Sequence, residues 1–130
     1  MTAVLDASAV LALLFGEPGA EAVVEHITAG AAMSTVNLAE VATVLIRNDR
    51  DPSAVLDPLR AQVEIVPFTD ADALTTAELY PEVSARGLSL GDRACLALAR
   101  RLDATAVTAE HLWAELELNI RVDTIRTSQR

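Results

Sequence analysis

Apolar residues along this 130-residue chain fall into two alternating patterns, short continuous runs and longer stretches with helical spacing. The continuous runs predict strands over residues 2–6, 31–35, 63–68, 104–109 and 121–125. The helical spacing predicts helices over residues 7–15, 20–30, 36–49, 52–62, 70–87, 89–103 and 110–116. Because strands alternate with helices, we predict an α/β fold with a central, mostly parallel sheet that helices cover on both faces.

Three features refine this organisation. Pro81 predicts a bend within the helix over 70–87, because proline cannot donate the helical hydrogen bond. The polar tail 126–130 is predicted to fray. Since the chain shows no linker and no internal repeat, residues 1–130 are predicted to form a single domain.

Composition narrows the functional classes. Half of the chain is hydrophobic but only 3% is aromatic, so the core is predicted to be aliphatic. The net charge of −9 argues against binding polyanions by bulk charge, so a nucleic-acid substrate would need a local arginine patch or a bound metal. The single cysteine, Cys95, excludes an intramolecular disulfide and fits a reducing compartment. With no apolar run long enough to span a bilayer and no signal peptide, we predict a cytoplasmic protein without a membrane anchor.

Four acids occupy unusual positions in this pattern. Asp6 ends a strand and has apolar residues on both sides, although removing a charge from water costs several kcal/mol. Glu40 and Asp92 lie near the starts of helices, and Glu110 follows the strand 104–109. A parallel sheet would gather these acids at one edge, where their repulsion would favour a divalent cation. Carboxylates without Cys or His suit Mg²⁺ or Mn²⁺ rather than zinc.

Each acid also has an ordinary alternative role at a helix start. Capping boxes are predicted from two pairs, Ser89 with Asp92 and Asn37 with Glu40. Asp6 could cap the helix that follows it, and Glu110 could be a solvated acid in a first turn. Ser8 and Thr108 could hold a metal-bound water or a phosphate oxygen, or could serve only in turns. Capping explains each acid singly, but four acids at one predicted edge favour a functional site.

Arginines near these acids leave two interpretations open. They either grip phosphate groups or form solvated basic faces; the residues concerned are Arg47, Arg50, Arg86, Arg93, Arg100 and Arg101.

Four segments together resemble the motifs of PIN-domain proteins, and specifically the VapC toxins of bacterial toxin–antitoxin pairs. They are "VLDASAVLALLFGEPG", "NLAEV", "SLGDRACLALA" and "VTAEHLW", and their order and spacing cover essentially the whole chain. The resemblance implies a three-layer α/β/α fold with about five parallel strands. It also implies a Mg²⁺- or Mn²⁺-dependent endoribonuclease, commonly a homodimer, that a VapB-like antitoxin inhibits. Asp6, Glu40 and Asp92 match the three core acids of the family, whereas Glu110 stands where many members have Asp.

Three functions compete at this point. The first is an enzyme that cleaves RNA phosphodiester bonds with metal-activated water, using Asp6, Glu40, Asp92 and Glu110. The second is a catalytically silent PIN-like module that docks a partner protein or RNA, and retention of all four acids argues against it. The third is a phosphoacceptor domain using Asp6, which would usually need a lysine late in the chain; this chain has no lysine.

Overall fold

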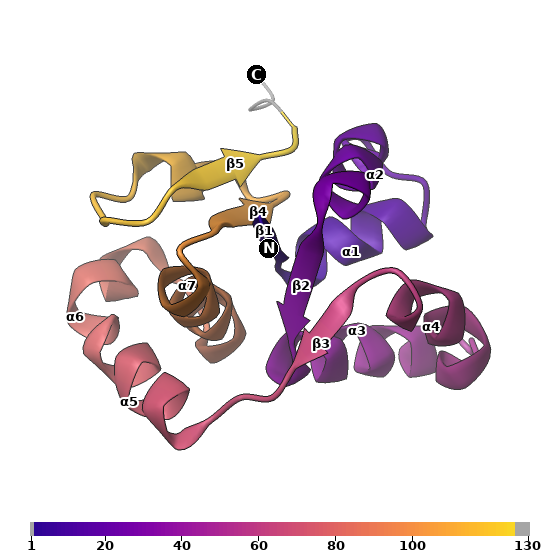
Figure 1. Ribbon diagram of the computed structural model, residues 1–130, viewed down its shortest axis with the longest axis horizontal. Helices are drawn as coiled ribbons and strands as arrows, with labels where there is room; N and C mark the ends of the chain where they lie inside the picture. The colour runs from indigo at the N-terminus through magenta and orange to yellow at the C-terminus, as the bar shows by residue number, and fades with distance from the viewer. Residues whose placement is uncertain (1, 127–130) are drawn as a thin grey trace.

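The structure, a computed structural model, describes residues 2–126 and contains one five-stranded sheet (Figure 1). All neighbouring strands pair in parallel, in the order β3-β2-β1-β4-β5. The strands are β1 (Ala3–Leu5), β2 (Ala31–Ser34), β3 (Glu64–Val66), β4 (Thr105–Thr108) and β5 (Val122–Thr124). The predicted parallel sheet is therefore confirmed, with each strand one to three residues shorter than its predicted run. Residues 127–130 of the tail that we predicted to fray lie outside the described part of the chain.

The helices occupy the predicted segments. They are α1 (Ala7–Leu14), α2 (Ala20–Ala29), α3 (Thr35–Arg47), α4 (Pro52–Arg60), α5 (Asp70–Glu78), α6 (Tyr80–Val83) and α7 (Leu90–Leu102). Two short 3₁₀ helices, η1 (Ser84–Arg86) and η2 (His111–Glu115), complete the set. The predicted bend at Pro81 is confirmed, because α5 ends just before the short helix α6 that contains this proline.

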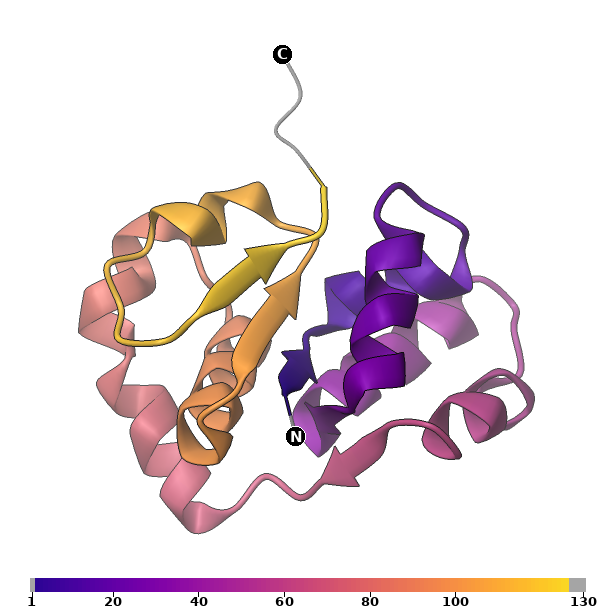
Figure 2. The ribbon, with the colours of Figure 1, turned by 45° about the horizontal axis from the view of Figure 1, so that its top comes forward.

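Two layers of helices enclose the sheet, as Figure 2 shows from a second direction. Helices α1 to α4 cover one face, and α5 to α7 cover the other (Figure 1). Alternate residues of a strand enter opposite cores: Val4 of β1 packs towards α7, whereas Ala3 and Leu5 pack towards α1 and α3. Cys95 is buried in the α7 core. The three-layer α/β/α arrangement is thus confirmed.

An ion pair joins α5 to α7 within the second layer of helices. Arg101 of α7 donates from Nε to Oδ1 of Asp72 at 2.8 Å and from a terminal nitrogen to Oδ2 at 3.0 Å. Asp72 is 3% exposed and also closes the capping box of α5 with Thr69. The contact therefore joins α5 to α7 and holds the helix that carries Asp92.

The strand order creates a reversal point between β1 and β4. From β1 the chain proceeds to β2 and β3 on one side, whereas β4 and β5 lie on the other side. Ligands of open α/β sheets bind at the carboxyl ends of the strands, at such a reversal. Asp6 directly follows β1 there, and its backbone amide donates to Val107 of β4 at 3.0 Å.

Within residues 2–126, no helix has the length and apolar character that crossing a bilayer requires.

Candidate active site

Asp6 lies at the reversal point and is almost fully buried, with 1% of its surface exposed. It is the N-cap of α1, because its Oδ1 accepts from the Ala9 amide at 2.8 Å. The predicted capping role is therefore real, but it uses only part of the carboxylate. Burial raises the pKa of Asp6 to about 6, although hydrogen bonds from Ala9 and two hydroxyls lower it.

Two hydroxyl groups hold Asp6 in place. Thr108 Oγ1 donates to Asp6 Oδ2 at 2.7 Å, and Ser8 Oγ donates to Asp6 Oδ1 at 2.8 Å. Each hydroxyl oxygen also accepts a backbone amide of the loop after β4, from Glu110 to Thr108 at 3.1 Å and from Ala109 to Ser8 at 3.0 Å. The two hydroxyl oxygens also lie 3.2 Å apart, so Ser8, Thr108 and Asp6 form one connected network. Ser8 and Thr108 therefore orient Asp6 in the structure.

Asp92 enters the site from the first turn of α7. The predicted capping box is confirmed, because Ser89 Oγ accepts from the Asp92 amide at 3.2 Å and Asp92 Oδ2 accepts from the Ser89 amide at 2.9 Å. This reciprocal pair fixes the side chain at the helix start. The capping bonds and the placement near Asp6 coexist, so the two interpretations of this acid are compatible.

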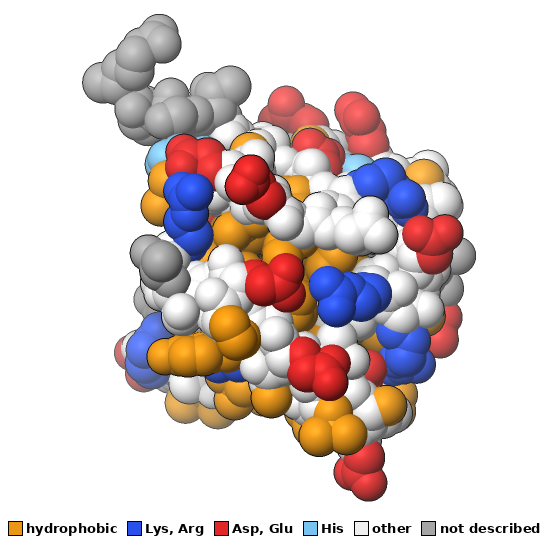
Figure 3. Space-filling model, turned by 90° about the vertical axis from the view of Figure 1, so that its left-hand side faces the viewer, with side chains coloured by type: hydrophobic (Ala, Val, Ile, Leu, Met, Phe, Trp, Pro, Cys, Tyr) orange, Lys and Arg blue, Asp and Glu red, His pale blue; other side chains and the backbone are white. Residues whose placement is uncertain are grey.

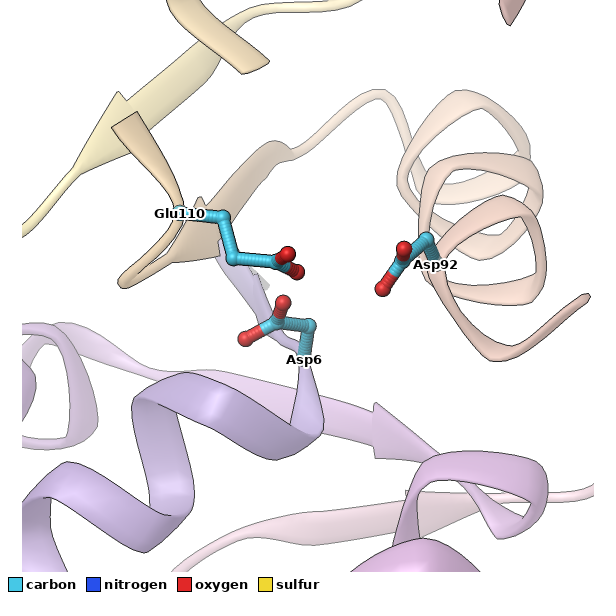
Figure 4. A group of neighbouring side chains, drawn as sticks. All are labelled: Asp6, Asp92 and Glu110. Carbon is cyan, nitrogen blue, oxygen red and sulfur yellow. The ribbon is translucent and has the colours of Figure 1, made fainter. Parts of the chain in front are cut away.

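Glu110 completes a group of three carboxylates at the end of β4. One oxygen from each of Asp6, Asp92 and Glu110 lies within 4.8 Å of the others. Figure 4 shows the three side chains pointing towards one another from the junction of β1 and α1, from α7 and from the loop after β4. Burial, followed by the charges of the neighbouring carboxylates, raises the pKa of Glu110 to about 7. The Glu110 carboxylate therefore reaches the other two.

Glu40 lies beside this group rather than within it. Its Oε1 accepts from Asn37 Nδ2 at 2.8 Å, and the same nitrogen donates to the Gly91 carbonyl at 3.0 Å. The Glu40 carboxylate lies so close to Gly91 that a side chain at this glycine would overlap it. Glu40 therefore contacts the residue next to Asp92, and its charge contributes to the raised pKa of Glu110.

The predicted capping box of Asn37 and Glu40 is wrong. Helix α3 begins earlier, with Ser34 as its N-cap, so both residues lie inside the helix. Asn37 is 1% exposed and joins α3 to α7 through its two hydrogen bonds. Sequence reasoning missed this role, because only the close approach of α7 at Gly91 reveals it.

This donor set fits a hard divalent cation. Three carboxylates with an oxygen each inside 4.8 Å can share one ion, and oxygen ligands suit Mg²⁺ or Mn²⁺. Burial raises the pKa of Asp6, and burial together with the neighbouring carboxylates raises the pKa of Glu110, so a cation would offset part of the cost of charging them. Of the four predicted site residues, the structure gathers Asp6, Asp92 and Glu110 and places Glu40 next to them.

The family model of the PIN domain matches residues 3–117 of the chain. The chain belongs to the PIN domain family. Among curated proteins, a search finds no match. The PIN match covers all the residues of the acidic site.

Solved structures share the fold at low identity. VapBC2 from Rickettsia felis, bound to a DNA fragment from its promoter, is 21% identical with a TM-score of 0.75, over 95% of this chain and 98% of that chain. VapBC-1 from nontypeable Haemophilus influenzae is 16% identical with a TM-score of 0.72, over 96% and 98%. VapC20 from Mycobacterium tuberculosis, a sarcin–ricin loop cleaving toxin, is 19% identical with a TM-score of 0.69, over 92% and 99%.

Proposed function

We propose that this PIN domain is a Mg²⁺- or Mn²⁺-dependent endoribonuclease and acts as a VapC-type toxin. The observation that carries the proposal is the group of three carboxylates at the reversal point of the sheet. Similarity to VapC20, a toxin that cleaves the sarcin–ricin loop, supports RNA as the substrate class. Which RNA is cleaved depends on surfaces outside the acidic group.

The proposed roles follow from the geometry of the side chains. Asp6, Asp92 and Glu110 would hold the ion, and Glu40 would complete the site from α3, beside Gly91. When bound, such an ion polarises a phosphodiester and lowers the pKa of water, which makes a nucleophile available near neutral pH. Ser8 and Thr108 keep both oxygens of Asp6 oriented. Without the ion the pKa of Glu110 is raised to about 7, so binding of the ion near neutral pH would require this carboxyl to lose its proton.

We also propose a VapB-like antitoxin as the partner. Several similar structures are toxin–antitoxin complexes, including VapBC2 from Rickettsia felis and VapBC-1 from Haemophilus influenzae. A chain with net charge −9 suits a partner whose contacting segment is basic. A homodimer and a cytoplasmic location belong to the same proposal.

RNA cleavage with defined metals tests this function. Wild-type protein is incubated with a panel of small RNAs in Mg²⁺, Mn²⁺ or EDTA, beside Asp6→Asn. We expect cleavage with either metal, none in EDTA, and a loss of at least about a hundredfold in the variant, as expected when one group that stabilises developing charge is removed. Equal cleavage in EDTA would contradict the metal-dependent proposal. Metal binding and RNA binding without cleavage would instead support the silent binding module.

A further inference from the structure

A groove of about 640 Å³ leads away from the acidic site between α3 and the start of α7. Glu40 and Gly91 line its inner end, and Arg47 lines it as the last residue of α3. We call this hollow the α3 groove. Asp6, Asp92 and Glu110 do not line the groove, but Gly91 precedes Asp92 and Glu40 contacts Gly91, so the groove reaches the residue next to the carboxylate group.

Arg47 has the position and the freedom of a phosphate-binding group. It lies seven residues after Glu40 on the same face of α3, which places it about 10 Å along the helix axis. Its side chain is exposed, and no acid of residues 2–126 lies within ion-pair distance of it. An unpaired guanidinium at this distance from the carboxylates can bind a phosphate of a polyanion that extends past them.

The floor of the α3 groove is apolar and has few free hydrogen-bonding groups that could distinguish one base from another. Val36, Val44 and Leu90 contribute to it, and Leu90 is 59% exposed. The two hydroxyls nearby are already engaged, because Thr43 donates to the Ala39 carbonyl at 2.8 Å and Ser89 caps α7. Such a surface packs against a base or a ribose without selecting the base.

We propose that the α3 groove holds the RNA segment that flanks the scissile phosphate, with Arg47 bound to a backbone phosphate and Leu90 packed on the neighbouring nucleoside. This inference rests on the proposed ribonuclease function and names the substrate contact that the carboxylates do not supply. RNA fits the Arg47 end of the groove better than a basic peptide does, because Arg47 attracts phosphate and repels a cationic segment, whereas the opposite charge, Glu40, lies next to Gly91. The face in Figure 3, which carries α5 and α6, intersperses acids with arginines.

A second hollow of about 460 Å³ provides an internal comparison. It shares Val44 with the α3 groove, includes Ser8 beside Asp6, and has Arg126 on its wall. Arg126 already donates to Glu17 at 3.1 Å, so its charge is partly neutralised. We therefore expect Arg47 to contribute more to RNA binding than Arg126.

Binding measurements in a cleavage-deficient background test the groove. In Asp92→Asn protein, the affinity for labelled oligouridylate and oligoadenylate is followed by fluorescence anisotropy from about 50 to about 200 mM KCl. One lost phosphate contact on a single strand reduces the slope of log affinity against log salt by about 0.7 and weakens binding about fivefold near 0.1 M salt. We expect this result for Arg47→Ala with both RNAs. We expect recovery of the slope in Arg47→Lys and no change in Arg100→Ala, an exposed arginine at the far end of α7.

Steady-state cleavage separates this inference from the proposed function. In an otherwise wild-type chain, Arg47→Ala should raise KM about fivefold with kcat unchanged, because the contact is made equally in the ground and transition states. Unchanged KM and salt slope in a chain that does cleave RNA would overturn the groove and leave the nuclease intact. Arg47-dependent binding in a chain that cleaves nothing would support the groove and overturn the nuclease. An effect of Arg100→Ala equal to that of Arg47→Ala would also overturn the groove.

Discussion

Replacing Asp6 by asparagine should make the metal-free protein more resistant to unfolding as the pH rises. Burial raises the pKa of Asp6 from its ordinary value of 3.8 to about 6, so the folded state binds this proton more tightly than the unfolded chain does. The contribution of Asp6 to the unfolding free energy is therefore greatest below pH 4, where the carboxyl is protonated, and is lost between pH 4 and pH 6. The loss amounts to roughly 3 kcal/mol of unfolding free energy above pH 6.

Asparagine keeps the shape and the N-cap of Asp6 but does not ionise. As an N-cap it is equivalent to aspartate, so the bond from the Ala9 amide remains. One of the two hydroxyls, Ser8 or Thr108, loses its acceptor, which costs about 1 kcal/mol at every pH. We expect the variant to be slightly less stable than wild type at pH 4 and about 2 kcal/mol more stable at pH 7.

Urea unfolding in EDTA, at pH values from about 4 to 8, measures this difference directly. The informative quantity is the difference in unfolding free energy between wild type and variant, followed as a function of pH, because contributions common to both proteins cancel. A difference that shifts by roughly 3 kcal/mol in favour of asparagine supports the reasoning. A difference that stays constant across this range would show that Asp6 has an ordinary pKa, and the argument that this site needs a cation would fail.

Three further substitutions test other parts of the account. Asp72→Asn should reduce the unfolding free energy by about 2–3 kcal/mol at pH 7, measured by urea unfolding, because Arg101 loses its charged partner. Burial raises the pKa of Asp72, but the hydrogen bonds and charge of Arg101 outweigh it and leave the pKa lowered. The contribution of this pair to stability should therefore fade as the pH falls below 4. Gly91→Ala should displace the Glu40 carboxylate and reduce cleavage at least about tenfold, while changing the unfolding free energy by less than about 1 kcal/mol. Normal cleavage by a variant whose crystal structure shows Glu40 displaced would exclude a role for this acid. Thr108→Val should raise the pKa of Asp6 further, because it removes a hydrogen bond to the charged carboxylate. The pH–rate profile should shift to higher pH, and an unshifted profile would contradict the role of this hydroxyl.

The sequence predicts the sheet and the helix positions well, because apolar periodicity and proline placement are local signals. The break before Pro81 and the capping box of Ser89 with Asp92 follow from neighbouring residues, and both are confirmed. Strand ends are less well predicted: β3 covers only Glu64–Val66, since Pro67 cannot donate to a ladder.

Arrangement within the site depends on distant packing and was harder to predict. Sequence order indicates that four acids approach one edge, but not which three meet. Glu110 joins Asp6 and Asp92 because the loop after β4 is tied to Ser8 and Thr108 by backbone amides. The spacing of Asn37 and Glu40 resembles a capping box, whereas the structure uses it to join α3 to α7.

The account depends most on the claim that Asp6, Asp92 and Glu110 form a binding site for one divalent ion. Titration calorimetry of Mn²⁺ into the RNA-free protein, near pH 7 and in two buffers with different ionisation enthalpies, tests this claim directly. We predict saturable binding that releases protons, because Glu110 and part of Asp6 must lose a proton to become ligands. We also predict that Asp92→Asn abolishes this binding. Equal binding in the variant, or no binding at millimolar Mn²⁺, would contradict the account.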